Sequence, residues 1–139
     1  MSSQLAPMQL NHLSFPSNDV VATASFFETY LGCTATPFGR SRLLKRPGFD
    51  IVIEDATDHP IQWPRNFHLG LELPTLAALQ DTYEKFKTSG AKITTELFYH
   101  VRGSRFFCEA PGGLLFEINT RADAKDEYRN SFESQVATR

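Results

Sequence analysis

Apolar and polar residues follow one another along the first half of the chain in a pattern that predicts one helix and four strands. Alternation over 9–15 predicts a strand, and apolar residues three or four apart between Asp19 and Gly32 predict a helix. Three shorter apolar runs bounded by turn residues predict further strands at 34–38, 42–45 and 49–54. The predicted order of elements is therefore βαβββ.

The second half of the chain repeats this order after a polar stretch that contains two prolines. A strand is predicted over 67–73, followed by a helix that is opened by Pro74-Thr75 and closed by Gly90. Three more strands are predicted at 92–99, 104–110 and 114–119. The two halves are therefore expected to form modules of the same topology.

The domain organisation follows from this repeat. We expect one domain over 9–121. The predicted boundaries are an N-terminal arm at 1–8, a first module at 9–55, a connector at 56–66, a second module at 67–121 and a C-terminal surface helix or tail at 122–139.

Composition narrows the classes of function. The 139 residues are 41% hydrophobic and 22% charged, as in a folded single domain. Fourteen Lys and Arg against sixteen Asp and Glu give a net charge of −2 with no basic block, which argues against nucleic acid as a partner. No apolar run approaches the roughly 18 residues of a membrane span, and the first residues lack the apolar core of a signal peptide, so we expect no membrane and a soluble cytoplasmic protein. Two cysteines are too few for a disulfide framework.

Two chemical features recur at what look like matching places of the two halves. Each leading strand carries a histidine, His12 in the first half and His68 in the second. Each closing strand carries a carboxylate between apolar residues, Asp50 in the first half and Glu117 in the second. Because neighbouring side chains of a strand point to opposite faces, Glu117 is expected on the face away from the helices.

A divalent metal would find two imidazoles and one carboxylate in the side chains of His12, His68 and Glu117. This set leaves coordination positions open for water or substrate and suits Zn²⁺, Mn²⁺, Ni²⁺ or Fe²⁺. Taken singly, each histidine has an ordinary explanation as a half-buried hydrogen-bonding residue, and Glu117 has one as a solvated carboxylate. Their occurrence in two repeated halves favours a metal site.

Two longer motifs carry a family resemblance. The first is Leu10-Asn11-His12-Leu13 with the helix that contains Phe26-Phe27 and Tyr30-Leu31-Gly32, and the second is Ala110-Pro111-Gly112-Gly113 leading into Phe116-Glu117-Ile118. With these motifs the chain resembles the vicinal oxygen chelate superfamily, which includes glyoxalase I, fosfomycin-resistance enzymes, extradiol dioxygenases and bleomycin-binding proteins.

The resemblance implies an α+β fold in which two βαβββ modules form a curved mixed sheet around a cleft. It implies a divalent metal (Fe, Mn, Zn or Ni) on His12, His68 and Glu117, and a small-molecule substrate that chelates this metal through its oxygens. It also implies pairing of two chains as a homodimer.

Within this superfamily, the segment 106–120 looks most like the closing strands of ring-cleaving extradiol dioxygenases. His100 is then the candidate acid or base for the reaction, unless it is only an exposed loop histidine. Many such dioxygenases carry a tyrosine ten residues before the ligand glutamate, and this chain has Phe107 there, as a candidate substrate contact. The acid/base set of a dioxygenase is therefore incomplete in this chain.

Other members of the superfamily leave alternatives open. Fosfomycin-resistance enzymes carry a hydroxyl residue two after the first histidine, where Ser14 lies. Arg102 and Arg105 offer guanidinium groups to an anionic substrate, although a solvated arginine on an edge strand is the more ordinary explanation of each. Glyoxalase I has a fourth ligand, for which Asp50 is the candidate and Glu54 the substitute.

The alternative outside enzymes is a metal-free protein that sequesters a drug or another small molecule, as bleomycin-resistance proteins do. Twelve Phe, four Tyr and one Trp are enough to line an aromatic groove. Retention of all three candidate ligands favours the enzyme.

Overall fold

The computed structural model describes residues 4–48 and 50–131. The chain divides into two compact units, Met1–Ile61 and Gln62–Arg139. The point of division lies inside the stretch 56–66 that the sequence marks as a connector. Among the described residues, no helix has the length and apolar character needed to cross a membrane.

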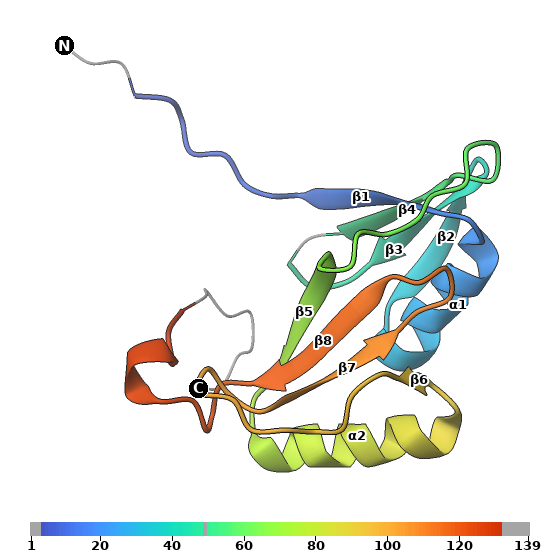
Figure 1. The fold of residues 1–139 in the computed structure, drawn as a ribbon. Helices are drawn as coiled ribbons and strands as arrows, with labels where there is room; N and C mark the ends of the chain where they lie inside the picture. Colours follow the sequence, from blue (N-terminus) through green and yellow to red (C-terminus); the bar gives the residue numbers. More distant parts are fainter. Residues whose placement is uncertain (1–3, 49, 132–139) are drawn as a thin grey trace. The chain divides into compact units, whose positions relative to one another are not determined.

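The first unit is a four-stranded mixed sheet with one helix, α1, packed on it (Figure 1). Its strands are β1 (His12–Ser17), β2 (Thr34–Phe38), β3 (Ser41–Lys45) and β4 (Asp50–Asp55). They lie in the order β1-β4-β3-β2, with β1 parallel to β4 and the other pairs antiparallel. The βαβββ order predicted for the first half is confirmed.

Local signals and packing explain helix α1 (Val20–Leu31). The Asp19 side chain accepts a hydrogen bond from the Ala22 N–H at 3.0 Å, and Gly32 ends the helix in the left-handed conformation. Phe27 of this helix is fully buried, as are Leu44 and Ile53 of the sheet below it. Burial of such side chains contributes about 2 kcal/mol each to folding.

The second unit repeats the topology. Its strands are β5 (His68–Leu73), β6 (Lys92–Ile93), β7 (Arg105–Glu109) and β8 (Leu115–Thr120), in the order β5-β8-β7-β6 with β5 parallel to β8. Helix α2 (Leu76–Ser89) is capped by the Thr75 hydroxyl, which accepts from the Ala78 N–H at 3.0 Å. The fully buried side chains of Leu79, Phe106 and Phe116 form its core. This half also has the predicted βαβββ order.

One predicted strand is largely wrong. The sequence predicts a strand over 92–99, but β6 covers only Lys92–Ile93, and Phe98 forms an isolated bridge with Arg105. The hydroxyl of Thr95 accepts the hydrogen bond of the Phe107 N–H at 2.9 Å. This side chain takes the place of a backbone carbonyl, so the ladder is interrupted there.

The ends of the chain carry little regular structure. Residues 4–11 have none, so β1 begins three residues later than the predicted strand. The predicted C-terminal helix or tail contains a short 3-10 helix, Asp126–Tyr128. Residues 1–3, Phe49 and 132–139, on which parts of the predicted arm, fourth strand and tail fall, lie outside the described residues.

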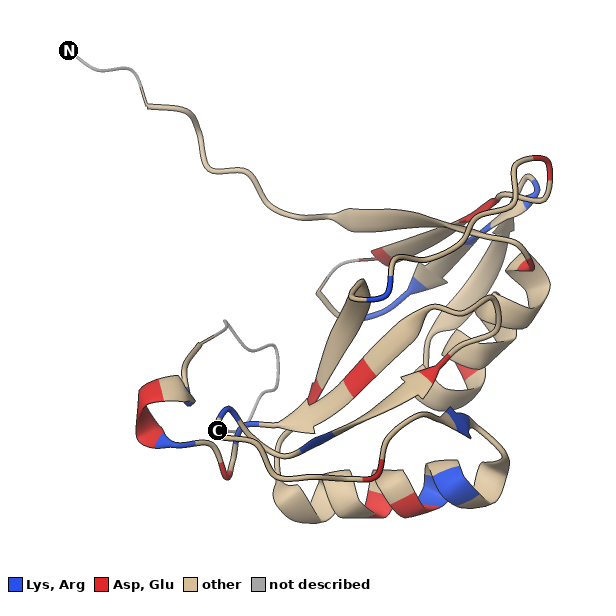
Figure 2. Ribbon diagram, in the orientation of Figure 1, with Lys and Arg blue, Asp and Glu red and all other residues tan. Residues whose placement is uncertain are grey.

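The outer face of α2 is charged, as Figure 2 shows. Lys85 pairs with Asp81 at 2.9 Å, and Lys87 pairs with Glu84 at 3.2 Å. These are ordinary solvent-exposed helix pairs. In each unit the helix covers one face of the sheet, and the opposite face, called here the helix-free face, carries the candidate site residues.

Candidate functional site

Strand alternation places the candidate residues on the helix-free faces. In β8 the flanking Phe116 and Ile118 are buried on the helix side, as predicted. Glu117 points to the other side, although it is itself only 9% exposed. The prediction that it leaves the core is thus correct, but it is not a solvated surface carboxylate.

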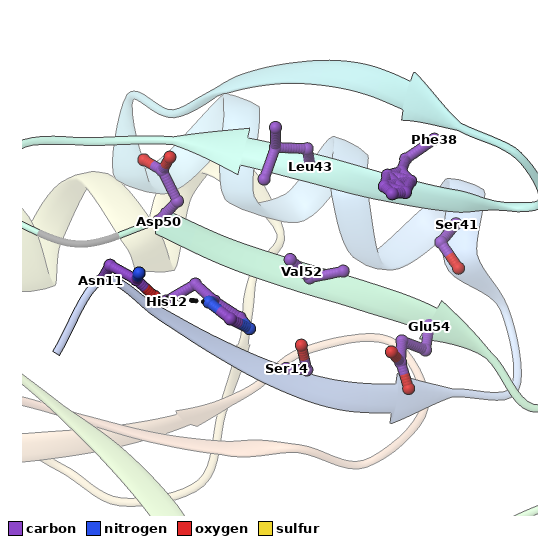
Figure 3. A pocket seen from close by; sticks show the side chains of 9 residues that line it. All are labelled: Asn11, His12, Ser14, Phe38, Ser41, Leu43, Asp50, Val52 and Glu54. Carbon is purple, nitrogen blue, oxygen red and sulfur yellow. Dashed lines mark hydrogen bonds between the residues drawn. The ribbon is translucent and has the colours of Figure 1, made fainter.

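In the first unit, the helix-free face forms an open hollow of about 600 Å³, the first-unit hollow (Figure 3). It is lined by Asn11, His12, Ser14, Phe38, Ser41, Leu43, Asp50, Val52 and Glu54. The candidate residues His12, Ser14 and Asp50 thus surround one space. Glu54, the alternative to Asp50 as a fourth metal ligand, lies at the far end of this space in the figure.

Two contacts fix polar groups at this hollow. The His12 Nδ1 lies 2.6 Å from the Asn11 Oδ1, which orients the exposed ring and leaves its Nε2 available. The Asp50 carboxylate accepts from the Lys45 ammonium at 2.7 Å. This hydrogen bond lowers the pKa of Asp50 below its ordinary value.

The matching of Asp50 with Glu117 is a prediction that the strand register corrects. His12 pairs with Asp50 across β1 and β4, whereas His68 pairs with Leu115 across β5 and β8. The residue that corresponds to Glu117 is therefore Val52, opposite Ser14. Asp50 lies one pleat away, at the place that Leu115 occupies in the second unit.

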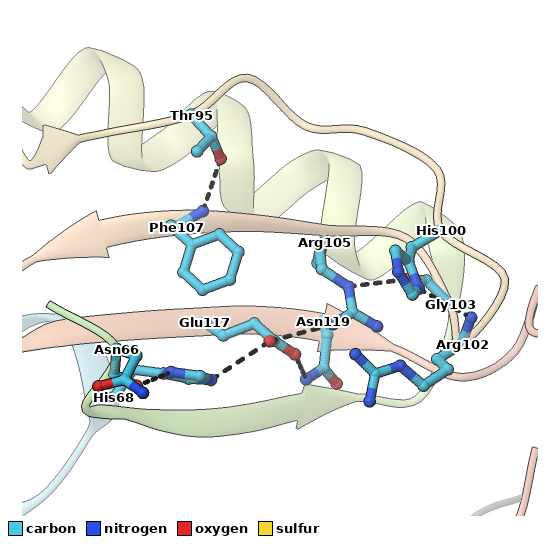
Figure 4. Close-up of polar contacts among 10 residues, drawn as sticks. All are labelled: Asn66, His68, Thr95, His100, Arg102, Gly103, Arg105, Phe107, Glu117 and Asn119. Carbon is cyan, nitrogen blue, oxygen red and sulfur yellow. Dashed lines mark hydrogen bonds and ion pairs between the residues drawn. The ribbon is translucent and has the colours of Figure 1, made fainter. Parts of the chain in front are cut away.

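In the second unit, His68 and Glu117 lie together on the helix-free face (Figure 4). The His68 Nε2 is 3.6 Å from the Glu117 Oε1, and the His68 Nδ1 is 3.2 Å from the Asn66 carbonyl oxygen. An Nδ1–H that donates to this carbonyl leaves Nε2 to face the carboxylate. In this tautomer the Nε2 lone pair points toward the carboxylate, so the two side chains present lone pairs to a common point.

Two further side chains hold the Glu117 carboxylate. Arg105 Nη1 donates to Oε1 at 3.1 Å, and Asn119 Nδ2 donates to Oε2 at 2.6 Å. Arg105 is only 7% exposed, and its Nε donates to the Gly103 carbonyl at 3.1 Å. We call the group of His68, Arg105, Glu117 and Asn119 the Glu117 cluster; its charges are buried and directly paired.

The donor set of the Glu117 cluster fits a divalent cation in part. Each oxygen of a carboxylate can accept twice, so Glu117 keeps a lone pair toward His68 while it accepts from Arg105 and Asn119. No group of three His, Cys, Asp or Glu residues that could hold a metal is present among the described residues. His12, the third predicted ligand, belongs to the other unit.

His100 lies in the turn before β7. Its Nδ1 accepts from the Arg102 backbone N–H at 3.1 Å, so the neutral ring carries its proton on Nε2. Partial burial, and then the guanidinium groups of Arg105 and Arg102, lower the pKa of His100. The neutral ring is thus suited to donate a hydrogen bond from Nε2, and less suited to remove a proton.

Phe107 forms an apolar wall beside the Glu117 cluster. Its ring meets the His68 ring edge to face, with 5.6 Å between centroids. The Phe98 ring lies nearly parallel to the Phe107 ring, with 6.5 Å between centroids and an angle of 15°. The position held by a tyrosine in many dioxygenases therefore offers a ring surface without a hydroxyl.

Sequence reasoning missed three asparagines that orient the candidate ligands. They are Asn11 beside His12, Asn66 beside His68 and Asn119 beside Glu117. For Asn119 a signal was present, because residues two apart in a strand share a face. The contact of His68 with Asn66 is made by a backbone carbonyl, for which side-chain identity gives no signal.

Comparisons with known proteins agree with this fold. The chain matches the Glyoxalase/Bleomycin resistance protein/Dioxygenase superfamily over residues 9–118. None of the curated proteins compared with the chain matches it.

Solved structures are similar along most of the chain. A structure from Bacillus cereus, described as a possible glyoxalase, has a TM-score of 0.70 at 24% identity, covering 81% of this chain and 99% of that one. A glyoxalase/bleomycin resistance protein/dioxygenase from Alicyclobacillus acidocaldarius has a TM-score of 0.67 at 21% identity, with coverage of 90% and 98%. A lactoylglutathione lyase from Agrobacterium tumefaciens has a TM-score of 0.66 at 10% identity, with coverage of 82% and 94%. The chain belongs to the glyoxalase/bleomycin resistance protein/dioxygenase superfamily.

Proposed function

We propose that the protein is a metal-dependent enzyme that acts on a small molecule. Proteins of this superfamily often use a divalent metal. The observation that carries the proposal is the approach of His68 Nε2 to Glu117 Oε1 at 3.6 Å, with the other ring nitrogen of His68 held by a carbonyl oxygen. This arrangement is typical of metal-ligating histidines, whose second nitrogen is oriented by an acceptor.

His12, His68 and Glu117 would hold the ion, which we take to be Fe, Mn, Zn or Ni. When bound, such an ion supplies Lewis acidity, which stabilises negative charge on substrate oxygens. Asn11 and Asn66 orient the two imidazoles, and Arg105 and Asn119 hold the carboxylate.

The remaining roles fall to side chains around these groups. We assign His100 a hydrogen bond from Nε2 to a substrate oxygen, and Phe107 a contact with the substrate's apolar part. Ser14 and Asp50, in the first-unit hollow, are assigned polar contacts with the substrate. Ring-cleaving dioxygenase chemistry is the first activity to assay, because two imidazoles and one carboxylate form the set used by non-haem Fe(II) oxygenases.

Metal analysis tests the proposal. Protein stripped with a chelator is dialysed against Fe²⁺, Mn²⁺, Zn²⁺ or Ni²⁺ in turn, and bound metal is measured by mass spectrometry. We expect about one ion per chain for at least one metal. His12→Ala, His68→Ala and Glu117→Ala should each lose it, whereas the control His59→Ala, at an exposed histidine of the connector, should retain it. Equal metal content in all four variants would overturn the proposal.

A second candidate, metal-free sequestration of a small molecule, is favoured by one observation. The buried Arg105 already neutralises Glu117, so the carboxylate needs no metal to balance its charge. Absence of metal uptake from all four solutions, together with tight binding of an aromatic compound, would support this candidate.

A further inference from the structure

The turn at 100–103 fixes two more nitrogen-bearing side chains at the end of β8. It is closed by a hydrogen bond from the Gly103 N–H to the His100 carbonyl at 2.8 Å. Gly103 has a φ of 112°, and a Cβ there would overlap the carbonyl oxygen of Thr120, so only glycine fits. The backbone that carries His100 and Arg102 is therefore held against the sheet.

Arg102, in the same turn as His100, adds a second guanidinium group beside the Glu117 cluster (Figure 4). Its guanidinium makes no hydrogen bond or ion pair with any residue that the structure describes. Figure 4 shows this side chain extending toward Arg105 and Asn119. Arg105 donates from Nε and Nη1, which leaves its Nη2 without a partner in the described part of the chain. Both guanidinium groups therefore keep donors that an anionic ligand could use.

An apolar ring surface adjoins these cations. Phe98 and Arg105 exchange two backbone hydrogen bonds, at 2.9 and 3.0 Å, so their side chains start from directly paired residues. Phe98 is 38% exposed, and its ring lies nearly parallel to the Phe107 ring. Guanidinium donors and aromatic surface therefore occur side by side on the helix-free face of the second unit.

We propose that this face binds a small aromatic acid. Its carboxylate would lie on the guanidinium groups of Arg102 and Arg105, and its ring would lie against Phe98 and Phe107. Paired guanidinium donors suit a planar carboxylate, and stacked rings add contact with little loss of conformational freedom. A divalent cation on Glu117 would raise the local positive potential further, so an anionic ligand is favoured with the metal and without it.

This inference rests on the proposed function, because it takes the Glu117 cluster to border the substrate site. It is tested without metal, so that the two proposals can fail separately. Benzoate, benzamide and acetate are titrated into the chelator-stripped full chain, and chemical shifts of backbone amides are followed by nuclear magnetic resonance. Benzamide keeps the ring and loses the charge, whereas acetate keeps the charge and loses the ring.

We expect benzoate to shift amides of 98–107 and 117–119 and to bind about tenfold more tightly than benzamide or acetate. Arg102→Gln should weaken benzoate binding about tenfold and leave benzamide unchanged within about twofold. Arg65→Gln removes an exposed arginine of the same unit and should change neither.

Other results of the same titrations would contradict the proposal. Three results would each overturn the aromatic acid as the ligand class. Benzamide could bind as tightly as benzoate, Arg102→Gln could leave benzoate binding intact, or benzoate at about 20 mM could cause no chemical shift changes. Metal uptake measured on the same preparations decides the proposed function independently: benzoate binding that depends on Arg102 in a chain that takes up no metal would sustain the inference and refute the metal-dependent enzyme.

Discussion

The helix-free faces of the two sheets share a topology but differ in how their charges are held. In the first unit, His12 and Asp50 border an open hollow, and Asp50 pairs with a lysine whose side chain is 60% exposed. In the second unit, Glu117 pairs with an arginine whose side chain is 9% exposed, and an amide holds its other oxygen. A buried, doubly held carboxylate keeps its position when a ligand arrives, whereas an exposed one is solvated and mobile.

The two repeated modules therefore carry different chemical groups on their helix-free faces. The position that corresponds to Glu117 in the first unit is Val52, so only the second unit has a carboxylate there. The first unit contributes an exposed imidazole and hydroxyl groups around a space of about 600 Å³. The helix-free face of the second unit thus presents a buried, directly paired charge, and that of the first unit an open polar surface.

Removal of the arginine partner should have the largest effect on stability. Arg105→Met leaves Glu117 buried without its cation and is expected to cost about 3 kcal/mol of unfolding free energy. Lys45→Met removes the corresponding partner of Asp50 and should change stability little, because that pair is solvated. Urea unfolding followed by circular dichroism measures both.

A double variant controls for lost packing. Arg105→Met with Glu117→Gln removes the charge that is left unpaired and should recover most of the stability. Equal losses in Arg105→Met and Lys45→Met would refute the contrast between a buried and a solvated pair.

The interiors of the two units should differ in the reactivity of their cysteine thiols. Each unit has one buried cysteine, Cys33 and Cys108. Burial raises the pKa of Cys108 to about 12, so the thiolate fraction at pH 8 is about 10⁻⁴. Burial also raises the pKa of Cys33, but the Arg46 guanidinium acts against it.

Alkylation by iodoacetamide at pH 8, read by peptide mass spectrometry, should therefore modify Cys33 before Cys108. Both should react at similar rates in denaturing urea, which serves as the control. Faster modification of Cys108 in the folded protein would show that the core of the second unit opens more readily than that of the first.

Much of the fold could be predicted because its signals are local. Asp19 and Thr75 cap the two helices within a residue or so of the predicted starts, and Gly32 and Gly90 end them as predicted. The predicted strand at 92–99 failed for a reason that is not local: whether the Thr95 hydroxyl replaces a backbone acceptor depends on where Phe107 lies, twelve residues away. Composition and alternation do not show that Thr95 and Phe107 come into contact.

The candidate site was predictable only to the level of a face. Alternation identifies which side of the sheet Glu117 occupies. A shift of two residues along the strand keeps the same face but changes the residue paired across the sheet, so the sequence pattern matched Glu117 with Asp50 instead of Val52. The contact of Arg105 with Glu117 depends likewise on the register of β7 against β8. Whether His12 shares an ion with His68 and Glu117 stays a prediction that metal analysis has to test.

The smallest expected effect concerns His100, and it reports on the charge that Arg102 brings to the second unit. Arg102→Gln removes one of the guanidinium groups that lower the pKa of His100, so this pKa should rise. It should stay below the ordinary value of 6.5, because burial and Arg105 still lower it. A nuclear magnetic resonance titration of the imidazole between pH 4 and 8 measures the change, with Arg65→Gln as the matched control. An unchanged pKa of His100 would mean that water fully screens the charge of Arg102. The helix-free face of the second unit would then be as well solvated as that of the first.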